Sequence, residues 1–483
     1  MRPDLRWATP AAALALIAAL TALRVAGLWF DRTGLYTDES QYWLWGQEMA
    51  FGAFSKPPLI GWIIRATTEI LGDTVFAARL AAPLIHGLTA VLVLALGLRV
   101  AGEKVAALGA MSYATMPAVA LGSALISTDT PMMACTAAAL ICQHELARRG
   151  RDWSRSPNIA LLLGLAVGLG LLAKYSMLFV VAGMALAAVL NRDWRIRLAD
   201  LIVAALVAAA VIAPNLWWVQ AHDFVTARHV AEDAEWQGVV LHPLQAAQYL
   251  AEQLAVMGPL LFAGFLVAAA RPALTPGAQR GLVWAALPVL LIVTGQALAS
   301  RALANWGVAF TVAGSLVAAA ALVRVPRLAA LSLVLGLAVS LALPAAKIWG
   351  TEWRLPNGDL ALARYLGRAE VSQRALAFAA AQGATVIVSG NRDLLADLSW
   401  QARGTIAVRA LPHDGAPQHH WDLLYRYDPA QTPGLVVILS RDAAPACAAG
   451  LAPLQQERWT AGPGFAEGQP FTLTLVPQGC LTP

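Results

Sequence analysis

The sequence changes from apolar to acidic and aromatic at Tyr36-Thr37-Asp38-Glu39-Ser40-Gln41-Tyr42-Trp43, shortly after an apolar run over residues 8–30. That run is long enough to cross a bilayer as a helix. It is too long for the apolar core of a signal peptide and has no convincing small-residue cleavage site, so we expect it to be retained. Carboxylates beside a bilayer are costly unless water or a partner receives them. The stretch therefore predicts a first transmembrane helix followed by a functional loop.

The composition of the whole chain indicates a membrane protein. Of its 483 residues, 58% are hydrophobic and 13% are charged, whereas soluble globular domains carry roughly 25% charged residues. The net charge is +5, but the basic residues stand in short clusters between apolar runs. That distribution fits the positive-inside rule better than a phosphate-binding stripe. We therefore predict a polytopic membrane protein without a nucleic-acid partner.

Further apolar runs of spanning length follow the first one. With it they predict about eleven transmembrane helices in a mainly α-helical bundle. The runs cover residues 8–30, 77–98, 105–125, 131–147, 158–173, 175–190, 199–218, 248–270, 281–299, 305–323 and 328–346.

The connections between these runs alternate in charge. Basic clusters such as Arg99/Lys104, Arg192/Arg195 and Arg324/Arg327 fall on every second connection, which predicts that these connections and the N-terminus are cytoplasmic. The loop 31–76 and the tail from Lys347 then face the other side. In a bacterial inner membrane that side is the periplasm.

The tail differs in character from the bundle. Short β-rich runs at 384–390, 405–410, 434–440 and 471–476 are separated by helical patterns over 359–382 and 393–403. We therefore expect a transmembrane domain over residues 1–346, with an outward catalytic loop at 31–76, and a small periplasmic α/β domain over 347–483. Cys447 and Cys480 lie in this tail and could pair only in an oxidising compartment.

Asp38 and Glu39 are the first candidate catalytic residues. Either carboxylate could act as a general base that removes a proton from an acceptor hydroxyl or amine. The alternative is a solvated turn beside the membrane. Tyr42 and Trp43 crowd the two acids, and this favours a site over a turn, with Tyr42 as a candidate contact of the substrate or carrier phosphate.

Lys56-Pro57-Pro58 supplies a positive charge further along the same loop. The two prolines stiffen the chain, so the ammonium group of Lys56 is held rather than free. A fixed lysine at the membrane surface suits a lipid phosphate. Ordinary snorkelling of a lysine to the interface is the competing interpretation.

Further candidates lie on connections predicted to face the same side. Asp129, in Ser127-Thr128-Asp129-Thr130-Pro131, is either a third acid of the site or only the cap of a helix that Pro131 helps to begin. The others offer hydrogen-bond donors for a phosphate or flat rings for a sugar, although each alone is no more than an interface anchor. They are Lys174, Tyr175, Arg301, Asn305 and Trp306.

The sequence gives little sign of a metal or nucleotide site. His229 and Glu232 have metal-like spacing, but a polar loop explains them better. Gly164, Gly168 and Gly170 lie inside an apolar run, where they indicate close helix packing rather than a dinucleotide loop. We expect no metal ligand and no certain cofactor; a divalent metal is possible but not indicated.

Four motifs occur in a fixed order: Thr37-Asp38-Glu39 with Tyr42, then Ser55-Lys56-Pro57-Pro58, then Thr128-Asp129-Thr130-Pro131, then Ala173-Lys174-Tyr175. In this order and topology they resemble bacterial family 39 glycosyltransferases of the GT-C group, which includes protein O-mannosyltransferases and the aminoarabinose transferases of lipid A. The chain departs from the aminoarabinose transferases at Gln41, where they tend to carry a basic residue, and at Ser55, where they carry a glutamate.

The resemblance implies transfer of a sugar from a polyprenyl-phosphate carrier to a periplasmic lipid, glycan or protein. It implies Asp38 as the catalytic carboxylate, Glu39 as its neighbour, Asp129 as a second acid and Lys56 as a contact of the carrier phosphate. Two other classes of function stay open at this stage, a lipid or polysaccharide transporter or flippase and a non-catalytic assembly scaffold. A transporter would place its acids near the bilayer midplane in related halves.

Overall fold

A computed structural model describes residues 5–149, 156–233, 240–441, 447 and 451–481. The chain forms two compact units. The helical unit comprises residues 1–29, 56–63 and 79–344, and the C-terminal unit comprises residues 30–55, 64–78 and 345–483. This grouping differs from a division at residue 346 because the acidic segment after the first apolar run folds with the C-terminal residues.

Every predicted apolar run coincides with a helix or a pair of helices. The elements from the first helix to the end of the bundle are α1 (Pro10–Trp29), α2 (Thr37–Glu48), α3 (Leu59–Leu71), α4 (Val75–Val100), α5 (Glu103–Thr115), α6 (Pro117–Ala124), α7 (Asp129–Arg149), α8 (Ser156–Ala173), α9 (Met177–Leu190), η2 (Arg192–Trp194), α10 (Leu198–Ala221), α11 (Val225–Asp233), α12 (Pro243–Met257), α13 (Pro259–Ala270), η3 (Pro272–Leu274), α14 (Gln279–Ala299), α15 (Phe310–Leu322) and α16 (Pro326–Trp349).

Two of the predicted spans are broken. Among the described helices, five are long and apolar enough to cross a membrane, and two bent pairs raise that number to seven. The run 105–125 bends by 49° between α5 and α6, and the run 248–270 bends by 115° between α12 and α13. Pro117 and Pro259 begin the second helix of each pair, and Gly258 has a φ of 93° that ends α12. Proline disfavours a helical conformation in the residue before it, which explains both breaks.

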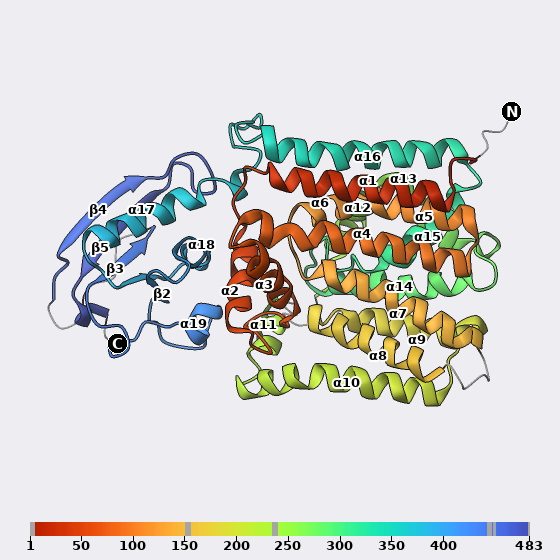
Figure 1. The fold of residues 1–483 in the computed structure, drawn as a ribbon, viewed down its shortest axis with the longest axis horizontal. Helices are drawn as coiled ribbons and strands as arrows, with labels where there is room; N and C mark the ends of the chain where they lie inside the picture. Colours follow the sequence, from red (N-terminus) through yellow and green to blue (C-terminus); the bar gives the residue numbers. More distant parts are fainter. Residues whose placement is uncertain (1–4, 150–155, 234–239, 442–446, 448–450, 482–483) are drawn as a thin grey trace. The chain divides into compact units, whose positions relative to one another are not determined.

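The helices of the helical unit pack around α15, in which all residues except Ala321 are buried. Figure 1 shows the long helices of this unit running side by side. Gly164 and Gly168 let α8 approach α10 closely, since a Cβ atom at these positions would lie 2.5 Å from the Ala204 carbonyl oxygen and 2.7 Å from Val211 Cβ. The interpretation of these glycines as packing residues is confirmed.

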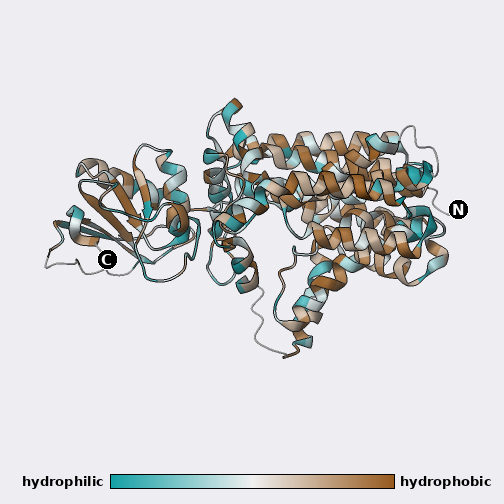
Figure 2. Cartoon of the chain, turned by 90° about the horizontal axis from the view of Figure 1, so that it is seen from below, coloured by the Kyte–Doolittle hydropathy of each residue, from teal (hydrophilic) through white to brown (hydrophobic). Residues whose placement is uncertain are grey.

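The basic connections lie together at one end of the helical unit. Arg99 donates to Glu145 at 2.9 Å, and the Trp194 indole N–H donates to the Ala278 carbonyl oxygen at 2.8 Å. These contacts join the ends of α4 and α7 and the connections before α10 and α14. Figure 2 shows hydrophilic residues gathered at this end, beside the N-terminus, and hydrophobic residues along the helices.

The C-terminal unit contains a mixed five-stranded sheet with strand order β2-β1-β3-β5-β4. β1 pairs in parallel with β2 and β3, whereas β5 runs antiparallel to β3 and β4. Its elements after α16 are η4 (Ala363–Tyr365), α17 (Arg368–Ala381), β1 (Val386–Ser389), α18 (Arg392–Ala402), β2 (Ala407–Ala410), α19 (His420–Leu424), β3 (Val436–Ser440), β4 (Gln455–Thr460), β5 (Pro470–Val476) and η6 (Gln478–Leu481).

Both faces of the central strands are buried, as expected for parallel strands covered on each side. Ile387 and Val437 face a core that includes Phe378 and Leu395 of α17 and α18. Val386 and Ile438 face a second cluster that includes Cys480, and Cys480 forms a disulfide with Cys447. Figure 2 shows the hydrophobic character of the strands. The α/β character of the tail is thereby confirmed.

Candidate active site

The acidic stretch forms the first turn of α2 in the C-terminal unit. α2 begins at Thr37, and Glu39 Oε2 accepts a hydrogen bond of 2.9 Å from the backbone N–H of Tyr36. Glu39 is only 2% exposed. A carboxylate that reaches back to the residue before the helix satisfies a donor that the helix leaves unpaired. The structure therefore places Glu39 where it fixes the start of α2.

Asp38 is the exposed member of the acid pair, with 43% of its side chain accessible. Its Oδ1 accepts from Nη2 of Arg392, and Nε of the same arginine donates to Gln41 Oε1 at 2.7 Å. One guanidinium group therefore bridges two side chains of α2. The bridge fixes the orientation of the Asp38 carboxylate, whose side chain stays accessible.

Arg392 is held at this position by the capping of α18. The Asn391 side chain accepts from the backbone N–H groups of Asp393 and Leu394 at 2.9 and 3.2 Å. Asp393 in turn accepts from the Thr37 hydroxyl at 2.7 Å. The beginnings of α2 and α18 are thus joined by several polar contacts. Sequence reasoning missed Arg392, which is 354 residues from Asp38.

Two more arginines surround the residue that precedes α2. Arg364 Nη2 donates to the Tyr36 hydroxyl at 2.6 Å, and its guanidinium carbon lies 4.7 Å from the centre of that ring. The corresponding distance for Arg368 is 5.4 Å. The hydrogen bond with Tyr36 raises the pKa of Arg364, whereas burial lowers the pKa of Arg368. With Arg392, they place three guanidinium groups beside the carboxylates of Asp38, Glu39 and Asp393 at the first turn of α2.

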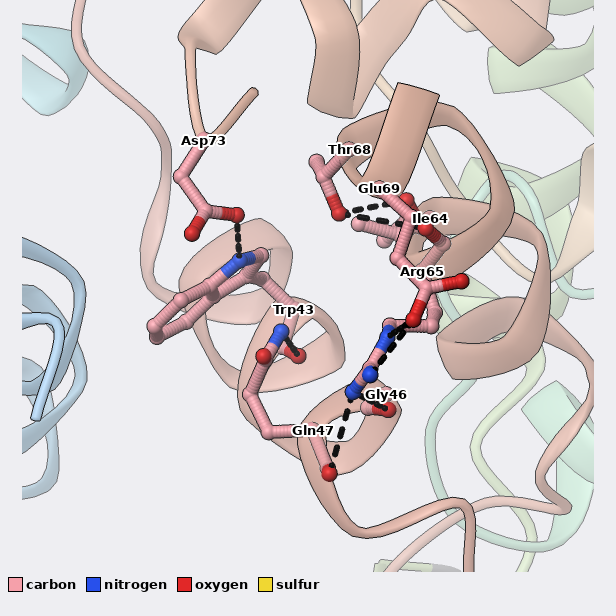
Figure 3. A network of polar contacts seen from close by, with 8 residues as sticks. All are labelled: Trp43, Gly46, Gln47, Ile64, Arg65, Thr68, Glu69 and Asp73. Atoms are coloured by element: carbon pink, nitrogen blue, oxygen red, sulfur yellow. Dashed lines mark hydrogen bonds and ion pairs between the residues drawn. The ribbon is translucent and has the colours of Figure 1, made fainter. Parts of the chain in front are cut away.

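The aromatic residues that follow Asp38 are packing residues in this structure. Tyr42, Trp43 and Trp45 are 6%, 4% and 5% exposed. The ring of Tyr42 lies 5.1 Å from that of Trp45. Figure 3 shows the indole N–H of Trp43 donating to Asp73, a bond of 2.7 Å. These rings anchor α2 in the C-terminal unit.

In the helical unit the structure brings together three of the predicted residues. Lys174 Nζ lies 2.7 Å from Asp129 Oδ1, and Asn305 Nδ2 donates to Asp129 Oδ2 at 3.0 Å. The side chains of Lys174 and Asp129 are 15% and 12% exposed. Asp129 begins α7, Lys174 lies between α8 and α9, and Asn305 lies before α15. This polar cluster therefore joins three separate parts of the helical unit.

The remaining predicted residues lie in both units. Tyr175 donates to Asn215 Oδ1 at 2.7 Å. Arg301 is exposed and Trp306 is half-buried in the segment that carries Asn305. Lys56, half-buried, belongs to the helical unit, whereas Asp38 belongs to the C-terminal unit.

A buried hydrogen-bond chain adjoins the polar cluster. The Thr130 hydroxyl lies 3.3 Å from Nε2 of His86, and Nδ1 of His86 lies 3.2 Å from the Tyr113 hydroxyl. His86 is 2% exposed, so it is a hydrogen-bonded packing residue. In the described part of the chain, no group of three His, Cys, Asp or Glu side chains could hold a metal ion.

Comparisons with known proteins place these features in a family. Residues 55–218 match the family model described as dolichyl-phosphate-mannose-protein mannosyltransferase. The chain is 37% identical over 480 residues to a lipid A galacturonosyltransferase, RgtD, of Rhizobium johnstonii, covering 98% of this chain and all of that protein. It is 27% identical to a lipopolysaccharide core galacturonosyltransferase, RgtB, of the same organism, over 61% of each chain.

Solved structures with the same fold include ArnT from Cupriavidus metallidurans bound to undecaprenyl phosphate, with a TM-score of 0.66, 14% identity, and coverage of 95% of this chain and 97% of that chain. The oligosaccharyltransferase of Archaeoglobus fulgidus gives a TM-score of 0.51 at 12% identity, covering 81% of this chain and 61% of that chain. The predicted fold class, a GT-C-like membrane helix bundle with a small C-terminal sheet, is confirmed. The full-length identity shows that this chain, a multi-pass membrane glycosyltransferase, belongs to the family 39 group of GT-C enzymes.

Proposed function

We propose that this enzyme transfers a uronic acid, galacturonic acid in the first instance, from a polyprenyl-phosphate carrier to a lipid A-type glycolipid. The observation that carries the proposal is the 37% identity, over 98% of the chain, with a lipid A galacturonosyltransferase. The arginines around the first turn of α2 support it, because guanidinium groups suit an anionic sugar.

We assign the role of general base to Asp38. It removes the proton from an acceptor hydroxyl as that oxygen attacks the anomeric carbon of the donor sugar. The bond between this carbon and the carrier phosphate breaks, and its electron pair stays on the phosphate oxygen. A single displacement of this kind inverts the anomeric centre. Arg392 keeps the carboxylate oriented through the shared contact with Gln41.

Negative charge grows on the carrier phosphate as the sugar leaves. We assign its stabilisation to Lys56 and Lys174, since fixed cations act strongly where charge develops. Asp129 then serves as a positioning residue, because its two oxygens accept from Lys174 and Asn305. Arg301, Tyr175 and Trp306 remain candidate contacts of the carrier or sugar.

We further propose that the enzyme lies in a bacterial inner membrane with its N-terminus in the cytoplasm and its C-terminal unit in the periplasm. The Cys447–Cys480 disulfide supports this orientation because such bonds persist in oxidising compartments. The gathering of basic connections at one end of the helical unit supports it as well. An alkaline phosphatase domain fused after residue 483 should then be active in cells; an inactive fusion would reverse the orientation.

The test is a transfer assay with purified enzyme in detergent. Galacturonosyl, mannosyl and aminoarabinosyl polyprenyl phosphates are each supplied with lipid A, and the product is identified by mass spectrometry. We expect the galacturonosyl donor to give product with an inverted anomeric configuration. Transfer of only a neutral or cationic sugar would overturn the proposed substrate, and retention of configuration would overturn the single displacement.

A further inference from the structure

The C-terminal unit contains a pocket of about 480 Å³ that the mechanism above does not use. One wall comes from α2 through Trp43 and Gln47, and Asp73 adjoins it. The end of α18 and β2 contribute Arg403 and Arg409 to the lining. All of these residues belong to the same compact unit.

The two arginines in this pocket are held by aromatic rings rather than by an acid of the described residues. Arg403 lies 5.0 Å from the centre of the Trp400 ring, and Arg409 lies 5.7 Å from that of Tyr425. Arg409 Nη1 donates to the neighbouring Val408 carbonyl oxygen at 3.0 Å, and no carboxylate of the described residues forms an ion pair with either guanidinium group.

Two other arginines of the same unit have acidic partners. Arg354 lies 2.9 Å from Glu467, and Arg374 lies 2.7 Å from Glu457. Two guanidinium groups without such partners on one pocket make a site for an anion with several acceptor oxygens, such as phosphate or carboxylate. Arg403 also has a φ of 46° at the end of α18, a conformation that a residue with a side chain rarely adopts.

Gln47 and Asp73 of the same pocket offer polar groups for sugar hydroxyl groups. Figure 3 shows Trp43, Gln47 and Asp73 grouped beside Arg65, whose guanidinium group donates to the backbone carbonyl oxygen of Gln47 at 3.2 Å. The Trp43 indole donates to Oδ1 of Asp73. A carboxylate and a side-chain amide can bind sugar hydroxyl groups. The pocket therefore combines Gln47 and Asp73, which can bind sugar hydroxyl groups, with Arg403 and Arg409, which can bind an anionic substituent of the sugar.

The pocket also lies on the helix that carries Asp38. Trp43 follows Asp38 by five residues on α2, which corresponds to a rise of about 7.5 Å along the helix axis. Five residues also turn the chain about 140° beyond one full turn, so Asp38 and the Trp43 side chain lie on different sides of α2, and a saccharide in the pocket must reach around the helix to meet Asp38. An acceptor must present a hydroxyl group to Asp38, which belongs to the same unit and the same helix as this pocket.

We infer that this pocket binds an anionic saccharide of the acceptor, a sugar that carries a phosphate or a carboxylate, and so holds the acceptor while Asp38 acts. The inference rests on the proposed function, since it assigns the pocket to that function's acceptor. It adds a second recognition site, separate from the residues assigned to the donor.

The test uses the full-length enzyme in detergent and saturation-transfer NMR, which detects weak binding of small sugars. The probes are N-acetylglucosamine 1-phosphate and galacturonic acid, with N-acetylglucosamine and galactose as uncharged matches. We expect at least one anionic probe to bind at least tenfold more tightly than its uncharged match. The Arg403→Gln/Arg409→Gln variant should lose that preference, whereas Arg458→Gln, which changes an exposed arginine on β4, should keep it.

The two probes separate the sources of the charge. A preference for the phosphate probe assigns the pocket to a phosphorylated acceptor, and a preference for galacturonic acid assigns it to an acidic sugar already on the acceptor. Equal binding of charged and uncharged probes, or an unchanged preference in the double variant, would overturn the inference.

Steady-state kinetics distinguish failure of this inference from failure of the proposed function. In the double variant we expect KM for the acceptor to rise at least tenfold while KM for the donor stays unchanged. If the enzyme transfers the uronic acid but the double variant keeps the wild-type acceptor KM, only the assignment of the pocket to the acceptor is contradicted. Arginine-dependent binding of an anionic probe by an enzyme that transfers no uronic acid supports the pocket as an anionic-saccharide site and contradicts the proposed function.

Discussion

Replacing Lys174 with methionine tests the polar cluster of the helical unit. Its ammonium nitrogen lies 2.7 Å from Asp129 Oδ1, where the Coulomb attraction is about 6 kcal/mol at an effective dielectric constant near 20. The cost of removing both charges from water offsets part of this, since the two side chains are only 15% and 12% exposed. Deleting the ammonium leaves the carboxylate with Asn305, so we expect a loss of about 3–5 kcal/mol in stability.

The double variant Lys174→Met/Asp129→Asn removes both charges and should recover much of that loss, because no uncompensated charge stays buried. The assay is the apparent midpoint of thermal unfolding in detergent, followed by tryptophan fluorescence. Lys104→Met, which changes an exposed lysine at the start of α5, is the matched control.

The same variants separate stability from catalysis. If Lys174 stabilises the departing phosphate, the double variant recovers its unfolding midpoint but not its transfer rate. A single variant as stable as the wild type would refute the energetic reasoning. Recovery of transfer in the double variant would show instead that the pair is only structural.

Three further predictions concern the C-terminal unit. Reducing the Cys447–Cys480 disulfide, which spans a sequence separation of 33 residues, should destabilise the unit by about 4 kcal/mol through loop closure and lower its unfolding midpoint, and an unchanged midpoint would contradict this. Burial lowers the pKa of His419, so the stability of the unit should fall as the pH drops below 6.5. Hydrogen bonds with Asp414 and then Asp422 raise the pKa of His413. The stability that protonated His413 contributes should therefore be lost as the pH rises above 6.5. Unfolding midpoints should be measured on both sides of pH 6.5. The fall in midpoint below pH 6.5 should disappear in His419→Gln, and the fall above pH 6.5 should disappear in His413→Gln. A wild-type pH dependence in both variants would refute the assignment. Arg392→Lys should retain more transfer activity than Arg392→Gln if the positive charge beside Asp38 matters, and equal rates would contradict that role.

Much of the fold could be predicted because hydrophobic runs are a local property of the sequence. Each apolar run became helical. The bend at Gly258 was not predicted, because the run around it stays apolar and only the Gly-Pro pair marks the break. Strand β4 was missed because the edge sequence Gln455-Gln456-Glu457-Arg458 is polar, and its pairing with β5 is a tertiary contact.

The candidate site could be predicted only in part. Asp129, Lys174 and Asn305 come from motifs that sequence reasoning singled out, and they are in contact. The partner of Asp38 was missed because Arg392 lies 354 residues away, and nothing local marks it beyond the asparagine cap before α18. The aromatic residues after Asp38 were expected at a binding surface but are buried, since composition alone does not distinguish a packed ring from an exposed one.

The most direct measurement of the central claim is the transfer rate of Asp38→Asn with a polyprenyl-phosphate-linked uronic acid and lipid A. Loss of a general base should lower kcat by about 10²–10⁴-fold, with the unfolding midpoint unchanged because the Asp38 side chain is 43% exposed. Asp414→Asn, which changes another exposed carboxylate of the same unit, should transfer at the wild-type rate. Near-normal turnover by a folded Asp38→Asn enzyme would contradict the account.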